Sequence, residues 1–176
     1  MNDMSNSTMG TSTEPGTVRL ERLLPGPIER VWTYLTESDK RATWFAGGTF
    51  DLRVGGKADL HFDHSNISSE KTPDEYKSKK SDWSETITRL EPPRLLSYTF
   101  GPAGPESEVT FELEPRGKDV LLVITHRRIV DRKTMVGVGG GWDAHVGILE
   151  DRLKGVEPRP FWTTHARLKR DYEARL

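Results

Sequence analysis

Histidine is the residue type in this sequence with the broadest capacity for chemistry, because an imidazole can take up or release a proton near neutral pH and can bind a metal. The chain of 176 residues has five histidines and no cysteine. The absence of thiols excludes disulfides, thiolate nucleophiles and thiolate metal sites. No G-x-S-x-G sequence occurs either, so nothing in the sequence supports nucleophilic catalysis.

Two of the histidines lie close together in the segment His61-Phe62-Asp63-His64. Side chains alternate between the two faces of a regular strand, so His61 and Asp63 point away from the face that His64 occupies. A metal site needs several converging ligands. We therefore expect no metal and no cofactor here, and we interpret His61 and Asp63 as part of a solvated outer face.

Two other histidines lie where a buried core is expected. Alternation places His126 on the apolar face of the last predicted strand, and helical periodicity places His145 at the edge of the buried stripe of the following helix. One interpretation is that both are core groups satisfied by hydrogen bonds. The other is that they orient the polar group of a bound ligand or act in general acid–base catalysis. The sequence leaves both interpretations open.

The helix that carries His145 is predicted over residues 140–154, between glycines that mark the two ends of an amphipathic segment. Its buried stripe consists of Trp142, Val146, Leu149 and Leu153. Its other side carries mostly charged residues, namely Asp143, Glu150, Asp151 and Lys154. Gly155 predicts the end of the helix, since glycine accepts the left-handed backbone that often follows a last turn. We interpret the glycine-rich run 137–141 as a hinge that lets the helix move as a lid.

The segments before this helix alternate between apolar and polar residues, which indicates strands. The predicted strands cover residues 17–24, 50–53, 58–64, 83–90, 95–100, 109–114 and 120–129. Two short helices, at 28–36 and 39–44, follow the first strand. A terminal helix is predicted from the stripe Phe161, His165, Leu168 and Tyr172. Since turns rather than crossover helices join the strands, the sheet is predicted to be antiparallel.

Composition predicts one domain over residues 17–176, preceded by a flexible tail at residues 1–16 that is poor in apolar residues. The polar segment 65–82 is interpreted as a solvated surface loop, although loops of this length are often functional or mobile. The net charge of −1, from 26 basic and 27 acidic residues, gives no field that favours nucleic acid or an anionic membrane. With no long apolar run and no signal peptide, we expect a cytoplasmic protein.

Four segments resemble the START-like (SRPBCC) superfamily: GGKADLHF, WSETITRLEPPRLLSYTF, VTFELEPRGKDVLLVITH and GGWDAHVGILEDRLKG. Within it they are similar to bacterial homologues of the C-terminal domain of the activator of heat-shock-protein-90 ATPase. The resemblance implies an α+β helix-grip fold of the Bet v type, in which a curved antiparallel sheet wraps around a long C-terminal helix. It also implies a cavity between sheet and helix that takes hydrophobic small molecules, in a superfamily that includes enzymes and co-chaperones.

We expect this cavity to bind a hydrophobic or aromatic small molecule, with Trp83 and Trp142 at its mouth. One alternative is a co-chaperone-like interaction protein that modulates a heat-shock chaperone ATPase. Another is a cavity enzyme of the cyclase, dehydratase or hydrolase type that uses His126 or His145. The expected partners are a small hydrophobic molecule, a chaperone or a second copy of the chain, but neither nucleic acid nor a membrane. The predicted ligand-binding residues are Leu60, Phe62, His64, Trp83, Tyr98, Phe100, Phe111, Ile124, His126, Trp142, His145 and Leu149.

Overall fold

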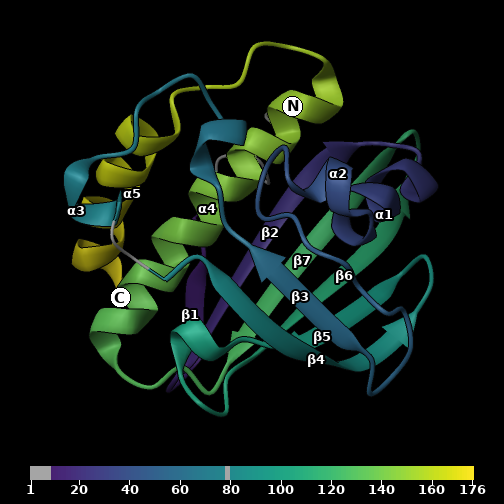
Figure 1. Cartoon of the computed structure of the whole chain (residues 1–176), viewed down its shortest axis with the longest axis horizontal. Helices are drawn as coiled ribbons and strands as arrows, with labels where there is room; N and C mark the ends of the chain where they lie inside the picture. The colour runs from purple at the N-terminus through teal and green to yellow at the C-terminus, as the bar shows by residue number, and fades with distance from the viewer. Residues whose placement is uncertain (1–8, 78–79) are drawn as a thin grey trace.

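The computed structural model describes residues 9–77 and 80–176, and within them seven strands form one antiparallel sheet (Figure 1). The strands lie in the order β1-β2-β7-β6-β5-β4-β3. Their bounds are Thr11–Glu14 (β1), Thr17–Pro25 (β2), Lys57–His61 (β3), Asp82–Glu91 (β4), Leu95–Thr99 (β5), Glu108–Arg116 (β6) and Asp119–Arg127 (β7). The long helix α4 (Arg132–Lys154) lies across the curved sheet, which confirms the predicted α+β helix-grip fold.

The remaining helices are short or terminal. As predicted, α1 (Ile28–Thr36) and α2 (Ser38–Arg41) follow β2, and α5 (Phe161–Arg175) comes last. The polar segment before β4 contains α3 (Asp74–Lys77), and single 3-10 turns occur at η2 (His64–Asn66) and η3 (Gly101–Ala103). Among the residues described, no helix combines the length and the apolar character that a membrane span requires.

The central strands are buried on the face that the alternation of their sequence predicts. In the β6–β7 pair, Phe111 lies opposite Ile124 and Val109 lies opposite His126. All four side chains are buried. Burial of a large apolar side chain contributes about 1.5–3 kcal/mol, so this face of the sheet supplies much of the driving force for folding.

The first strand, β1, corrects the prediction of a flexible tail. Residues 1–8 of that tail lie outside the described residues, but Thr11–Glu14 forms a strand that pairs with β2. All four of its side chains are exposed. The strand is held by backbone pairing, and the N–H of the preceding Gly10 donates to the Tyr172 hydroxyl at 2.6 Å. A strand held in this way has no apolar periodicity that a sequence pattern detects.

The predicted strand over residues 50–53 is also wrong, because this stretch meets β3 only through isolated bridges, Phe50 to Ala58 and Gly47 to His61. Leu52 and Val54 are 45% and 62% exposed. The chain crosses β3 closely at Gly48, where φ is 111° and a Cβ would lie 2.1 Å from the Asp59 carbonyl oxygen. The apparent alternation therefore belongs to an irregular loop. At its far end β3 stops at His61, short of the predicted residue 64.

Helix α4 begins well before the glycine-rich run, so the predicted start at residue 140 is wrong. The Asp131 side chain caps it by accepting a hydrogen bond from the Thr134 N–H at 2.8 Å, an arrangement that stabilises a helix N-terminus. The glycines at 137–141 therefore lie inside a continuous helix and do not form a hinge in front of it. The predicted end is confirmed, since Gly155 adopts the left-handed conformation with φ of 70°.

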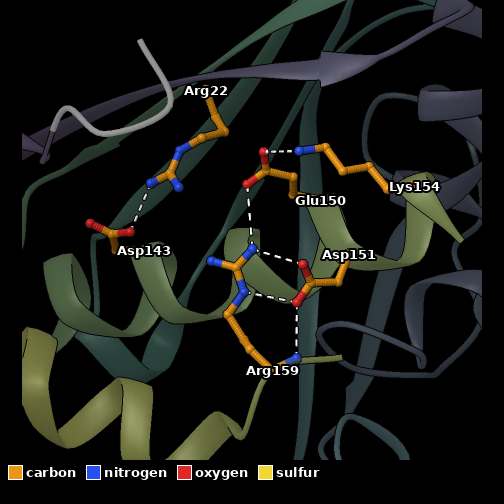
Figure 2. A network of polar contacts seen from close by, with 6 residues as sticks. All are labelled: Arg22, Asp143, Glu150, Asp151, Lys154 and Arg159. Carbon is orange, nitrogen blue, oxygen red and sulfur yellow. Dashed lines mark hydrogen bonds and ion pairs between the residues drawn. The ribbon is translucent and has the colours of Figure 1, made fainter. Parts of the chain in front are cut away.

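The predicted charged side of α4 is not exposed to solvent: of the four charged residues assigned to it, only Lys154 is exposed, while the three carboxylates are buried. The reason is that β2 and the segment before α5 supply arginines that pair with them (Figure 2). Arg22 donates to Asp143 at 2.7 Å, and Arg159 donates to Asp151 through Nε and Nη2, both at 2.8 Å. Glu150 pairs with Lys154 at 3.0 Å and with Arg159 at 3.5 Å.

Candidate functional site

An apolar pocket of about 630 Å³ lies between the first half of α4 and the segments around the ends of β3, β4 and β5. We refer to it as the α4 pocket. Its wall combines aromatic rings from the sheet side with glycines and an indole from the helix. The residues that line it are Phe45, Phe62, His64, Tyr76, Lys80, Trp83, Phe100, Pro102, Thr134, Gly137, Val138, Gly141, Trp142 and His145.

The structure brings half of the predicted ligand-binding residues together at this pocket. The six that line it are Phe62, His64, Trp83, Phe100, Trp142 and His145. The other six do not line it but are buried in the core, each at most 1% exposed: Leu60, Tyr98, Phe111, Ile124, His126 and Leu149. Ring packing fills the deeper space, with the Phe111 centroid 5.4 Å from that of Trp142 and 5.6 Å from that of Tyr98. The alternation of apolar and polar residues therefore predicted which side chains lie on the inner face of the sheet. It did not predict which part of that face borders a pocket and which part is filled by packed side chains.

His126 has a structural place behind the pocket wall. Its Nδ1 accepts a hydrogen bond from the Trp142 indole N–H at 2.9 Å, and its Nε2 lies 3.0 Å from the Ser107 hydroxyl. An indole N–H only donates, so the neutral ring carries its proton on Nε2 and donates to Ser107, which in turn donates to the Phe100 carbonyl. Burial lowers the pKa of His126 to about 3. The neutral imidazole thus joins Trp142 and Phe100, two residues of the wall.

His145 is the histidine that both belongs to α4 and faces the pocket. Its Nδ1 donates to the Trp44 carbonyl at 2.8 Å. Because a carbonyl oxygen only accepts, the proton of the neutral ring is on Nδ1 and Nε2 is left as an acceptor. Burial, followed by the nearby His64, lowers the pKa of His145 to about 3. Of the two histidines considered for ligand orientation or catalysis, His145 is therefore the one that lines the pocket.

His64 extends the aromatic wall toward α5. Its ring centroid lies 5.6 Å from that of His145 and 4.8 Å from that of Trp162. Burial and the neighbouring His165 lower the pKa of His64 to about 4. Both imidazoles of the pocket are consequently neutral at pH 7, where they act as hydrogen-bonding groups without net charge.

Phe45 is the ring at the centre of the wall, and the sequence analysis missed it. Its centroid lies 4.8 Å from Trp142, 5.1 Å from Phe62 and 5.2 Å from His145. Edge-to-face and tilted ring pairs at such distances stabilise the arrangement of aromatic side chains. Its position just before the Gly47-Gly48 pair indicated only the end of a short helix. No periodicity marks a single ring that turns inward from a loop.

Two further groups of lining residues were missed, one in the polar segment 65–82 and one on α4. Tyr76 of α3 stacks on Trp162 with ring centroids 4.6 Å apart, and Lys80 precedes β4. The unusual length of the segment was the one available signal for these. On α4, Gly137 and Gly141 face the pocket, and a Cβ built on either would meet no atom within 4 Å. Their i, i+4 spacing was the signal, but we interpreted the run as a hinge.

His61 lies away from the pocket on the outer face of β3. Its Nδ1 lies 2.5 Å from Asp82 Oδ1 on β4, and both side chains are exposed. Asp63 accepts from the Ser65 backbone N–H at 3.1 Å and does not pair with His61. Within the described part of the chain, no group of three His, Cys, Asp or Glu side chains is arranged to hold a metal ion.

Comparison with known proteins places this geometry in a family. A protein from Bordetella parapertussis solved by solution NMR is 46% identical, with 95% of this chain and 90% of that chain covered and a TM-score of 0.81. CalU16 from Micromonospora echinospora is 23% identical, with coverages of 95% and 94% and a TM-score of 0.67. DynU16, described as a protein of the dynemicin biosynthetic locus, is 19% identical, with coverages of 82% and 49% and a TM-score of 0.63. At these lower identities the likeness shows the fold alone.

No curated protein matches the chain significantly. Residues 25–154, which run from the end of β2 to the end of α4, match the family described as Activator of Hsp90 ATPase homolog 1-like protein. The matched stretch contains the whole wall of the α4 pocket. The chain belongs to this Activator of Hsp90 ATPase homolog 1-like family.

Proposed function

We propose that the protein binds an aromatic or otherwise apolar small molecule in the α4 pocket. The observation that carries the proposal is the pocket itself: about 630 Å³ of space walled by aromatic rings from the sheet side and by Trp142 and two glycines from α4. Small-molecule sites are concave, largely apolar and roughly 300–1,000 Å³ in volume, with a few polar groups that fix orientation. The α4 pocket has each of these properties.

The polar groups of the pocket support a ligand that carries a hydrogen-bond donor. His145 leaves Nε2 as an acceptor, since its Nδ1 donates to the Trp44 carbonyl. Trp142 is held by His126, so its indole N–H is already used and its ring forms an apolar surface. A flat aromatic molecule with a hydroxyl or amine fits this combination.

The setting of a relative agrees with this proposal. DynU16, which shares the fold, is described as a protein of a biosynthetic locus. A cavity that holds a small molecule has an evident use in such a setting. The likeness supports a cavity protein and not any particular ligand.

The direct test is titration with N-phenyl-1-naphthylamine, a neutral aromatic fluorophore whose emission rises in apolar surroundings. We expect saturable binding to the wild-type protein and a matching rise in its thermal midpoint, because a ligand that binds only the folded state stabilises it. Gly141→Leu places a side chain in the open space beside α4. It should abolish the fluorescence signal.

Gly141→Ala is the matched control, because it adds a single methyl group at the same position. It should retain binding within about fourfold, since the loss of one methylene-sized volume costs a ligand about 0.8 kcal/mol at most. Equal binding to wild type and Gly141→Leu, in a variant that remains folded by circular dichroism, would show that the fluorophore sits elsewhere.

A second candidate is a co-chaperone-like interaction with an Hsp90-type ATPase, which the description of the family favours. It predicts that the purified protein changes the turnover of such an ATPase in a concentration-dependent way. An unchanged turnover at saturating protein would count against it. Because Gly141→Leu changes the pocket and not the outer surface, an effect on turnover that this variant retains would separate the second candidate from ligand binding.

A further inference from the structure

The residues that line the α4 pocket include a positively charged side chain but no negatively charged one among those described. Among the described residues that line it there is no aspartate or glutamate, and the two histidines are held neutral by burial. Lys80 therefore carries the single formal charge of this described lining. A ligand with a negatively charged group meets one cation and no opposing carboxylate in the wall.

Lys80 stands at the mouth of the pocket with its ammonium group held over a ring. Its Nζ lies 4.1 Å from the ring centroid of Trp83, which also lines the pocket. Such a cation–π contact positions an ammonium without using its N–H donors. No ion pair joins Lys80 to a carboxylate of residues 9–77 and 80–176. The indole ring of Trp83 therefore positions the Lys80 ammonium, and no carboxylate of the described residues neutralises its charge.

A second, polar pocket of about 610 Å³ continues from this mouth beneath the segment before β4. The two pockets share Phe62, His64, Tyr76 and Lys80. The polar pocket is lined in addition by Lys71, Lys77 and several serines. A molecule that lies in the α4 pocket can therefore extend its polar end past Lys80 without leaving the protein surface.

The two carboxylates that line the polar pocket are already engaged. Glu70 accepts from the Thr163 N–H at 2.8 Å and from its hydroxyl. Asp63 accepts from the Ser65 N–H at 3.1 Å and from its hydroxyl at 2.6 Å. These hydrogen bonds lower the pKa of each carboxyl group. The carboxylates secure local turns and helix starts, while Lys80 faces the space that both pockets share.

We infer that the ligand is an amphiphilic acid, with an aromatic or apolar body in the α4 pocket and an anionic group bound by Lys80 at the mouth. This inference rests on the proposed function and names the class of molecule that the site selects. The anionic group is a carboxylate, sulfonate or phosphate, each of which accepts hydrogen bonds from an ammonium. The site recognises the anionic group because its described lining has one cation and no carboxylate. The contact with Trp83 holds the Lys80 ammonium in place at the mouth.

The test uses two fluorophores that share one aromatic body. These are 1-anilinonaphthalene-8-sulfonate, which carries an anionic group, and N-phenyl-1-naphthylamine, which lacks it. Lys80→Gln should weaken binding of the sulfonate about fivefold, because partly exposed charge pairs contribute on that scale. It should change binding of the neutral amine by less than about twofold. Lys80→Glu should enlarge the difference, and added salt should weaken the sulfonate more than the amine.

Lys118→Gln is the matched control, since Lys118 is an exposed lysine of the turn between β6 and β7. It should leave the affinities of both fluorophores unchanged. Lys80→Arg, which keeps the charge, should retain the preference for the sulfonate. Lys80 is exposed, so we expect every substitution there to leave the thermal midpoint of the free protein unchanged.

The outcomes separate this inference from the proposed function. If the amine binds and Gly141→Leu abolishes that binding, the pocket holds a ligand. If Lys80→Gln then weakens both fluorophores equally or neither of them, the inference of an acidic group is overturned while the proposed function stands. If neither fluorophore binds to wild type, both fail. A loss confined to the sulfonate supports the acidic amphiphile.

Discussion

The two sides of α4 differ in what occupies the space beside their glycines. Toward α5, a Cβ on Gly139 would lie 2.8 Å from the Tyr172 ring, and one on Gly140 would lie 3.4 Å from the Lys169 backbone. Toward the sheet, a Cβ on Gly137 or Gly141 would meet nothing within 4 Å. The same residue type thus allows close helix packing on one side and leaves room on the other. The pocket is therefore a local feature of a helix that is tightly packed elsewhere.

The polarity of the two sides differs as well. On the α5 side, buried carboxylates of α4 pair with arginines from β2 and from the segment before α5 (Figure 2). On the pocket side, the polar groups are imidazoles held neutral by burial. Buried ion pairs hold α4 in place on its packed side. Neutral imidazoles line α4 and the facing wall on the side where the pocket lies. Substitutions on the α5 side should therefore lower the stability of the fold. Substitutions that fill the space on the pocket side should instead weaken ligand binding.

The largest effect is expected on the packed side, from Asp143→Ala. Asp143 accepts from Arg22 at 2.7 Å and from the Tyr172 hydroxyl at 2.8 Å, and all three residues are buried. Removing one partner of a buried ion pair leaves an uncompensated charge and costs about 3–5 kcal/mol. Urea denaturation should show a loss of this size in the free energy of unfolding.

Asp171→Ala is the control for this prediction, because Asp171 lies on the exposed side of α5. It should change the free energy of unfolding by less than about 0.5 kcal/mol. An equally small change in the free energy of unfolding for Asp143→Ala would mean that the ion pair with Arg22 does not stabilise the packing of α4.

The next effect is expected from pH, through one buried histidine of the pocket wall, His145, and one in the core behind it, His126. Burial lowers the pKa of His126 and of His145 from 6.5 to about 3. Below about pH 6.5 the unfolded chain therefore binds protons that the folded protein does not. The free energy of unfolding decreases as the pH is lowered through this range. At pH 5 the difference amounts to about 2 kcal/mol for each imidazole. Urea denaturation between pH 7 and about pH 5 measures it.

Replacing the imidazoles sharpens this prediction. His145→Gln should flatten the pH profile by about one of these increments, whatever its effect on stability at pH 7. A profile that stays flat in the wild-type protein would show that His126 and His145 are not held neutral in the folded protein.

The fold was predictable from the sequence because its strands alternate and its main helix has an apolar stripe. Phe111 and Ile124, or Trp142 and Leu149, were assigned to the buried side from spacing alone, and they are buried. Two of the failures, β1 and the buried carboxylates of α4, have one physical cause. β1 is held by backbone pairing, and the carboxylates of α4 are buried because arginines distant in sequence cover them. Neither contact leaves a local pattern.

The candidate site was predictable only as the inner face of the fold. Phe62, Trp83 and His145, which were predicted from alternation and helical spacing, line the α4 pocket. Tyr98 and Ile124 have the same strand pattern but lie in the filled core, because whether a side chain meets space or another side chain depends on the packing of the facing element. Phe45 and Tyr76 come from irregular segments, for which periodicity gives no direction.

Gly139→Ala should destabilise the protein by about 1–3 kcal/mol, the usual range for overpacking. The added methyl group would lie 2.8 Å from the Tyr172 ring, well inside the contact distance of two carbon atoms. Tyr172 itself is fixed, since its hydroxyl donates to Asp143 and accepts from the Gly10 N–H. The ring therefore has little freedom to move away. Thermal and urea denaturation measure the loss, and an unchanged midpoint would mean that α5 readily shifts.

Gly141→Ala gives the smallest effect and the opposite sign. Alanine in a helix interior is favoured over glycine by about 0.5–1 kcal/mol because less backbone freedom is lost on folding. At Gly141 the new methyl group meets no atom within 4 Å, so no packing cost offsets the gain. The free energy of unfolding should rise by this amount, while the ligand loses a small part of its space. Destabilisation by Gly141→Ala would contradict an open pocket side, and it would remove the difference between the two faces of α4 on which the binding proposal depends.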